Sequence, residues 1–138
     1  DCGPAKAFDL EKMQGATIIS PNESETKALT GIYPDTDEAI LKASEILKER
    51  SKAEYVVLKL GDRGCAIYDG DTLHTLSPYP TRVVDTTAAG DCFTAAMALH
   101  YVKTSNILEA CDIGNRAGAY AVSSMGAENS MPAYEDIK

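Results

Sequence analysis

The stretch YVVLKLG at residues 55–61 is the strongest secondary-structure signal in this chain of 138 residues. Its β-branched and aliphatic side chains follow one another without polar alternation, and a glycine ends the run. Such continuous apolar runs are typical of strands that are covered on both faces, as in sheets flanked by helices. We therefore expect a buried central strand, and the sequence on either side predicts what surrounds it.

On the N-terminal side, a second strand and a helix are predicted. The run ATIIS at residues 16–20 is short and apolar, which indicates a buried strand. The tetrapeptide Ser20-Pro21-Asn22-Glu23 has the form of a capping box with proline at the first helical position. We expect the helix that follows to end at Gly31.

A longer helix is predicted between this one and the central strand. The segment DTDEAILKASEILKE at residues 35–49 begins with a second capping pattern, from Asp35 to Glu38. Apolar residues then recur at helical spacing, at Ile40, Ala43 and Leu47. This pattern predicts an amphipathic helix with one buried face.

On the C-terminal side, CAIYDGDTLHTL at residues 65–76 contains turn signals that predict an antiparallel hairpin. TRVVD at 81–85 indicates a further short strand, and helices are expected over 88–102 and 106–123. The order of these elements predicts an α/β fold, a layered αβα arrangement. Its sheet should be mostly parallel with an antiparallel hairpin at one edge. The length favours a single domain over residues 1–138.

Composition excludes several classes of protein. A net charge of −8 argues against a nucleic-acid or anionic-membrane surface, and 44% hydrophobic residues are typical of a globular chain. No apolar run is long enough for a membrane span, and the sequence has no P-loop, GxGxxG, HExxH or GxSxG. The cysteines show no metal-ligand spacing, which favours reduced, buried thiols in a cytoplasmic protein. They are Cys2, Cys65, Cys92 and Cys111.

The segment DTTAAGDCF at residues 85–93 places small residues between two aspartates at an expected helix start. One interpretation is packing, because small residues let a helix lie close to a strand. The other is chemical, because a helix N-terminus presents free N–H groups and the positive end of the helix dipole. A phosphate could then approach Ala88, Ala89 and Gly90, with the Asp91 carboxylate beside it to remove a proton from an attacking hydroxyl.

The longer segment VVDTTAAGDCF at 83–93 resembles the C-terminal signature of the ribokinase-like carbohydrate kinases, the PfkB family. Three further segments resemble family blocks and occur in the family's order. ISPNESETKALTG at 19–31 is similar to its Asn-x-x-Glu segment, LKLGDRGCAIY at 58–68 to its nucleotide-side turn, and GNRAGAYAVSSMGAENSMP at 114–132 to its last helix and loop. The resemblance covers nearly the whole chain and the C-terminal half of a typical member.

The resemblance implies ATP-dependent phosphorylation of a sugar or sugar-like hydroxyl. Asp91 would be the catalytic base, and the amides around Ala88, Ala89 and Gly90 would form the anion hole for the transferring phosphoryl group. Asn22 and Glu25 match the family motif that organises Mg²⁺ beside the phosphates. The same spacing recurs at Asn106 and Glu109, where helix capping explains it.

Further nucleotide contacts are implied by the same resemblance. Gly61 and Gly64 would pass close to the nucleotide, and they also suit a tight strand-to-strand turn. Asn115 matches the adenine-side asparagine, although a hydrogen-bonded core residue is the other interpretation; it shares a small, apolar stripe with Cys111, Gly118 and Val122. Many relatives carry threonine or serine where Lys59 stands, so contact with a phosphate and exposure to solvent both remain open for Lys59.

Some family members also bind a monovalent cation, K⁺, next to the anion hole. Such a site would fall on Asp85, the Thr87 carbonyl, the loop at Gly126 and the Ser130 hydroxyl. All of these ligands are oxygens, as a hard alkali cation requires. Simple capping of the turn by Asp85 is the alternative.

Acceptor recognition in the family lies mainly in the N-terminal half, which leads us to expect that this chain is a fragment whose substrate cannot be named. The partners expected are a small sugar-like substrate, no nucleic acid and no membrane, with a homodimer for the full-length protein. Two other functions stay open: a nucleotide-binding module without catalysis, and a structural interaction domain whose small-residue turn only packs.

Overall fold

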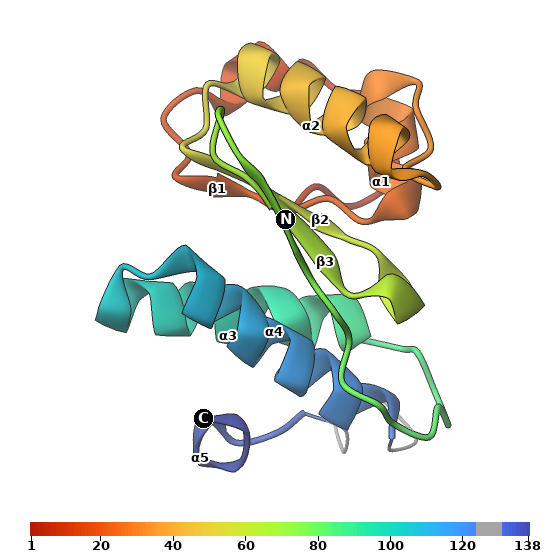
Figure 1. Ribbon diagram of the computed structural model, residues 1–138, viewed down its shortest axis with the longest axis vertical. Coiled ribbons are helices and arrows are strands. Elements are labelled where there is room, and N and C mark those ends of the chain that lie inside the picture. Colours follow the sequence, from red (N-terminus) through yellow and green to blue (C-terminus); the bar gives the residue numbers. More distant parts are fainter. Residues whose placement is uncertain (124–130) are drawn as a thin grey trace. The chain divides into compact units, whose positions relative to one another are not determined.

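The computed structural model describes residues 1–123 and 131–138, which form two compact units, Asp1–Thr75 and Leu76–Lys138 (Figure 1). A sheet and two helices make up most of the first unit, and a pair of long helices makes up most of the second. Each unit has a hydrophobic cluster of its own.

The first unit is built on a four-stranded sheet with the order β1-β2-β3-β4. The strands are β1 (Ile18–Ile19), β2 (Tyr55–Lys59), β3 (Cys65–Tyr68) and β4 (Leu73–Leu76), which ends at the boundary of the unit. β1 and β2 are parallel, whereas β2 and β3 are antiparallel. The strands predicted at residues 16–20 and 55–61, the edge hairpin at 65–76 and the α/β class are therefore confirmed.

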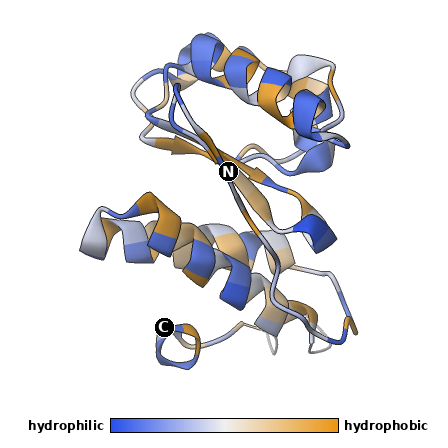
Figure 2. Cartoon of the chain, in the orientation of Figure 1, coloured by the Kyte–Doolittle hydropathy of each residue, from blue (hydrophilic) through white to orange (hydrophobic). Residues whose placement is uncertain are grey.

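Helices α1 (Glu23–Thr30) and α2 (Asp37–Ser51) cover one face of this sheet (Figure 1). Side chains from β2 and α2 meet in one core cluster, which includes Val56, Leu58, Ile40 and Leu47. In Figure 2 the strands β1 and β2 are coloured as hydrophobic, whereas α2 shows hydrophobic and hydrophilic bands. The helical periodicity seen in the sequence thus corresponds to one buried face of α2.

Both predicted capping patterns are displaced in the structure. The first helix is capped by Asn22 rather than Ser20, and Pro21 precedes the helix instead of opening it. The second is capped by Thr36, whose hydroxyl accepts a hydrogen bond from the Ala39 N–H, and not by Asp35. The Asn22 side chain accepts from the Glu25 N–H, just as the Thr36 hydroxyl accepts from the Ala39 N–H. Each cap therefore bonds to an N–H three residues further along, and the helices begin at Glu23 and Asp37.

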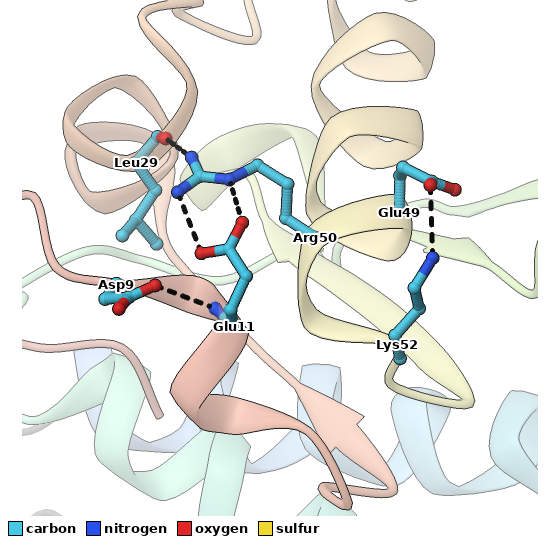
Figure 3. A network of polar contacts seen from close by, with 6 residues as sticks. All are labelled: Asp9, Glu11, Leu29, Glu49, Arg50 and Lys52. Atoms are coloured by element: carbon cyan, nitrogen blue, oxygen red, sulfur yellow. Dashed lines mark hydrogen bonds and ion pairs between the residues drawn. The ribbon is translucent and has the colours of Figure 1, made fainter.

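An arginine clamp joins three segments of the first unit (Figure 3). Arg50 of α2 donates to both carboxylate oxygens of Glu11, at 3.1 and 3.4 Å, and to the Leu29 carbonyl of α1 at 3.3 Å. Glu11 lies in a short 3-10 helix, Leu10–Met13, that Asp9 caps. These hydrogen bonds, those from Arg50 first, lower the pKa of Glu11 from its ordinary 4.5 to about 2.

We expect the clamp to stabilise the first unit in a pH-dependent way. Because the pKa of Glu11 is depressed in the folded chain, its contribution is present above pH 4.5 and is lost as pH falls towards about 2. The Glu11→Gln variant should therefore melt at a lower temperature than wild type at pH 7, and the two curves should converge near pH 2. The effect should be small, because the pair is exposed to solvent. Glu49→Gln, which removes the separate Lys52 pair, is the control.

The second unit is a tight pair of helices, α3 (Ala89–Thr104) and α4 (Ile107–Val122), with the short helix α5 (Tyr134–Ile137) beside them. Their shared cluster contains Cys92, Ala96, Ile113, Ala117, Ala121 and Ile137. The two long helices approach each other closely at Gly114, because a Cβ there would lie 3.0 Å from the Phe93 ring. Both long helices were predicted from the sequence, whereas α5 was not.

The strand predicted at residues 81–85 is wrong. This segment has no strand conformation, and Val83 and Val84 are exposed. The N–H groups of Val84 and Asp85 instead donate to the Val122 carbonyl at the end of α4, at 2.7 and 3.2 Å. The segment therefore caps the C-terminal end of α4. Its β-branched residues favour a strand locally, but these tertiary hydrogen bonds hold the backbone in another conformation.

The expectation of buried thiols is confirmed, since all four cysteines are free and buried. No helix in the described part of the chain is long and apolar enough to cross a membrane.

Candidate functional site

The small-residue turn at the start of α3 has an unusual backbone. Ala88, the N-cap residue, adopts a left-handed conformation with φ of 63°, and its side chain makes no capping hydrogen bond. Gly90 and Asp91 follow in the first helical turn, and both are exposed. The first N–H groups of a helix have no intrahelical partner. The Ala89 N–H donates to the Thr86 carbonyl, at 3.3 Å. This turn therefore combines a helix start without a side-chain cap, small side chains and one carboxylate.

Asp85 holds the other end of the same turn. Its Oδ1 accepts a hydrogen bond from the Thr87 N–H at 2.8 Å, while its own N–H is held by the Val122 carbonyl. α4 also lies close to the start of α3, since a Cβ on Gly118 would come within 3.7 Å of the Ala89 carbonyl. The turn is thus fixed by Asp85 from one side and by α4 from the other.

The left-handed residue gives a direct test of how this turn is held. Replacing Ala88 by glycine should raise the free energy of unfolding by about 0.5–1 kcal/mol, because glycine adopts positive φ without the Cβ clash. Ala89→Gly, one residue later but inside α3, should lower it by a similar amount, about 0.5–1 kcal/mol. Chemical denaturation of the two variants checks this, and equal effects would contradict the conformation of Ala88.

Asn22 and Glu25 form a complete capping box at the start of α1. The Asn22 carboxamide accepts from the Glu25 N–H at 2.8 Å, and the Glu25 Oε2 accepts from the Asn22 N–H at 2.8 Å. Glu25 is only 6% exposed, and a Cβ on Gly3 would lie 3.1 Å from its Oε1. Asn106 caps α4 in a weaker version, accepting only from Glu109 N–H at 3.2 Å.

Gly61 and Gly64 form the tight turn between β2 and β3. Both have positive φ, 58° for Gly61 and 82° for Gly64. Gly61 opens a short 3-10 helix, Gly61–Arg63, and Gly64 is the C-cap residue of that helix. The Leu60 N–H donates to the Gly64 carbonyl at 2.9 Å. The structural reason for both glycines is therefore clear, and a Cβ on Gly61 would also lie 3.3 Å from Glu23 Oε1.

Asn115 and Lys59 are both buried, although the sequence left their surroundings open. The Asn115 side chain donates to the Ser77 carbonyl at 3.3 Å, as a hydrogen-bonded core residue does. Lys59 is 8% exposed and its ammonium lies 3.5 Å from the Asp1 carboxylate. Exposure of Lys59 to solvent, one of the two sequence alternatives, is therefore excluded.

The structure thus gathers the predicted residues into two groups. In the first unit Asn22, Glu25 and Lys59 lie together at the carboxyl ends of β1 and β2, because Asn22 bridges Lys59 in parallel register. In the second, Asp85 and Thr87 adjoin the turn from Ala88 to Asp91. Gly126 and Ser130 lie outside the described residues.

Sequence reasoning missed the residues that support these groups. Gly3 against Glu25 and Asp1 beside Lys59 carry no local signal, because both contacts join distant parts of the chain. The contribution of α4 was detectable, since Gly118 belongs to the small-residue stripe noted in the sequence. Among residues 1–123 and 131–138, no three His, Cys, Asp or Glu side chains gather into a metal-binding cluster.

Comparison with known proteins now identifies the family. The model of the pfkB family of carbohydrate kinases matches residues 3–134. The chain belongs to this family. The pfkB-family chain is 36% identical over 135 residues to a bifunctional ribokinase/ribose-5-phosphate isomerase A of Fructilactobacillus sanfranciscensis, covering 97% of the chain and 25% of that protein. It is 33% identical to a ribokinase of Lactococcus lactis, covering 98% and 42%.

Solved structures agree with the family and the fold. A ribokinase of Arabidopsis thaliana, solved in complex with ribose and ATP, superposes with a TM-score of 0.88 at 34% identity. That match covers 98% of the pfkB-family chain and 44% of the plant protein. A ribokinase of Thermotoga maritima gives 0.84 at 32% identity, covering 97% and 45%. The ribokinase-like α/β fold is therefore confirmed, and the chain spans less than half the length of these relatives.

Proposed function

We propose that this chain provides the phosphate-donor side of an ATP-dependent kinase that phosphorylates a hydroxyl of a sugar or sugar-like molecule. In this proposal Asp91 is the general base, and the amides of Ala88, Ala89 and Gly90 form the anion hole. The sugar class follows from the relatives, several of which are ribokinases, and D-ribose is the first acceptor to test.

The observation that carries the proposal is the uncapped start of α3. A helix N-terminus attracts anions through its free N–H groups and its dipole, and no side chain from the N-cap residue fills this one. Ala88, Ala89 and Gly90 add little bulk, so a phosphoryl group can approach the backbone. Asp91 is exposed in the same turn, and in this proposal its carboxylate takes the proton of an acceptor hydroxyl as that hydroxyl attacks.

The donor sets also fit the metal ions that the resemblance implies. Glu25 presents a buried carboxylate that is fixed through one oxygen, and carboxylate oxygens suit Mg²⁺. Mg²⁺, when bound with ATP, would neutralise charge on the phosphates. Asp85 and the Thr87 carbonyl are oxygen donors that suit K⁺, and the remaining ligands in this proposal, Gly126 and Ser130, lie outside the described residues.

Gly61, Gly64 and Asn115 complete the proposed nucleotide side. The turn between β2 and β3 exposes Gly61, so the backbone there can be approached closely. Asn115 has a hydrogen-bond partner in Ser77, and a carboxamide has further donor and acceptor capacity for a base. An adenine contact and a core role are therefore compatible for this residue.

Calorimetric titration with Mg·ATP tests the proposal. Wild type should bind saturably, Gly90→Val should abolish binding because its side chain fills the anion hole, and Asp91→Asn should retain most of it. Gly118→Ala, outside the proposed hole and with ordinary packing distance to Ala89, is the matched control. Unfolding curves confirm that each variant is folded.

The two alternatives give different results in the same experiment. A nucleotide-binding module without catalysis binds Mg·ATP, and its Asp91→Asn variant loses no phosphotransfer because wild type has none. A structural domain whose turn only packs binds no nucleotide in any form. If this chain binds no nucleotide, the same titration is repeated on the longest natural protein that contains it. Binding by the longer protein would indicate a nucleotide site that needs additional residues, and no binding would indicate a structural role.

A further inference from the structure

A pocket in the second unit is lined by none of the described residues that we assign to the proposed function. It has a volume of about 390 Å³, within the range of small-molecule sites, and its walls are residues 79–81, one side of α4 and the end of α5. Asn115 is not among the lining residues of α4, and its side chain donates to the Ser77 carbonyl. The lining residues of α4 recur at helical spacing and so form one stripe: Arg116, Ala119, Tyr120 and Ser123.

Arg116 provides a fixed cation in the wall of this pocket. Its Nε donates to the Tyr79 hydroxyl at 3.0 Å, and the guanidinium lies 5.3 Å from the centre of the Tyr79 ring. Nη2 lies 3.0 Å from the carboxylate of Asp112, to which the Tyr79 hydroxyl also donates, at 2.8 Å. A guanidinium has five N–H donors, so donors remain for a ligand. An arginine held in this way is preorganised to bind a carboxylate or a phosphate through paired hydrogen bonds.

The pocket also offers polar groups that suit the hydroxyls of a ligand. Thr81 and Tyr120 line it, and neither side-chain hydroxyl has a partner in the part of the chain that the structure describes. Asp136 adds a carboxylate whose Oδ2 accepts from the Ala133 N–H at 3.2 Å, so its other oxygen can accept from a ligand. Hydroxyl groups both donate and accept, which matches this mixture of side chains.

The remaining wall of the pocket is apolar. Pro80, Ala119 and Ile137 line it together with the Tyr120 side chain, which is 42% exposed. A sugar ring carries C–H groups on its faces and hydroxyls around its edge, so it can pack on a tyrosine ring and still form hydrogen bonds. An apolar ligand would leave the guanidinium and the hydroxyls unused, and an inorganic anion would leave the apolar wall unused.

We propose that this pocket binds a phosphorylated sugar, with Arg116 on the phosphate and Tyr120 against the sugar ring. Two cations, Arg116 and Lys138, and one carboxylate, Asp136, are among the described lining residues, although the whole chain has a net charge of −8. The pocket is thus locally positive on an acidic protein, which favours an anion there. The inference goes beyond the proposed function and does not depend on it. When both hold, the ligand belongs to the class of compound that the reaction produces.

Calorimetric titration with ribose 5-phosphate, D-ribose and inorganic phosphate tests the pocket. Ribose 5-phosphate should bind saturably, and each of the other two should bind at least about tenfold more weakly because it makes only part of the contacts. Arg116→Gln should weaken binding of ribose 5-phosphate by about 10- to 100-fold, as expected for the loss of charged hydrogen bonds. Arg82→Gln, which removes an exposed arginine that does not line the pocket, is the matched control and should bind like wild type.

Ala119→Leu tests the same pocket without touching its charges. Leucine is a good helix former, so α4 should remain intact while the larger side chain fills the pocket. Binding of ribose 5-phosphate should be lost, and a melting curve confirms that the variant is folded. If Arg116→Gln and Ala119→Leu both bind ribose 5-phosphate like wild type, or if wild type does not bind it, the inference is overturned.

The remaining outcomes separate this inference from the proposed function. Equal affinity for inorganic phosphate and ribose 5-phosphate would show an anion site without sugar recognition, which overturns the inference. Loss of ribose 5-phosphate binding in Gly90→Val alone would assign that ligand to the turn before α3, which also overturns it. Failure of wild type to bind Mg·ATP, with ribose 5-phosphate bound and lost in Ala119→Leu, would contradict the proposed function and support the pocket.

Discussion

Replacing Asp91 by asparagine should lower kcat for sugar phosphorylation by about 10²–10⁴-fold, the range found for loss of a general base. The amide is nearly the same size as the carboxylate, so the first turn of α3 and its N–H groups stay in place. Affinity for Mg·ATP should therefore remain close to that of wild type. The loss should appear in kcat and not in binding, because in the proposed function the carboxylate acts only when the acceptor hydroxyl gives up its proton.

Steady-state phosphotransfer to D-ribose, in the longest natural protein that contains this chain, measures this effect. The control is Asp112→Asn, which removes an exposed carboxylate that pairs with Arg116 on α4. An Asp91→Asn protein that retains wild-type kcat would show that Asp91 is not the base. Loss of Mg·ATP affinity together with kcat would instead assign Asp91 to the nucleotide site or to the fold of the turn.

Leu47→Ala should be the most damaging of the stability variants, lowering the free energy of unfolding by about 2–5 kcal/mol. Leu47 is fully buried, in the cluster where α2 packs against β2. Truncation removes apolar contact and leaves a cavity that the surrounding strands and helix fill only in part. The cost combines the lost transfer free energy with that cavity.

Leu41→Ala provides a matched control on the same helix. Leu41 is 37% exposed, so its truncation should change the free energy of unfolding by less than about 0.5 kcal/mol. Urea unfolding followed by circular dichroism compares the two variants. Equal losses would contradict the assignment of Leu47 to the buried face of α2.

The regular elements could be predicted where local pattern and burial agree. The run at residues 55–61 predicts a strand buried on both faces, and the periodicity of 35–49 predicts a helix with one buried face. The structure contains both, as β2 and α2. The strand predicted at 81–85 failed for the opposite reason. Its valines favour a strand locally, but the backbone N–H groups of Val84 and Asp85 bond to the end of α4, a partner that no local pattern reveals.

The candidate site was predictable in its residue types and not in its contacts. The small-residue turn and Asp91 are adjacent in the sequence, so a local motif identified them together. The pairing of Lys59 with Asp1 and the approach of Gly3 to Glu25 connect positions far apart along the chain. Such contacts depend on how β1 and β2 align, which sequence spacing alone does not define.

The capping box at Asn22 and Glu25 has a consequence for the thermodynamics of ligand binding. A surface glutamate must give up several freely rotating bonds when it captures a ligand, and that loss of entropy weakens the complex. Glu25 has already given up this freedom, because its side chain is buried and bonded to the Asn22 N–H when α1 forms. The carboxylate is preorganised, so a ligand that reaches it encounters a rigid acceptor whose ordering was completed during folding.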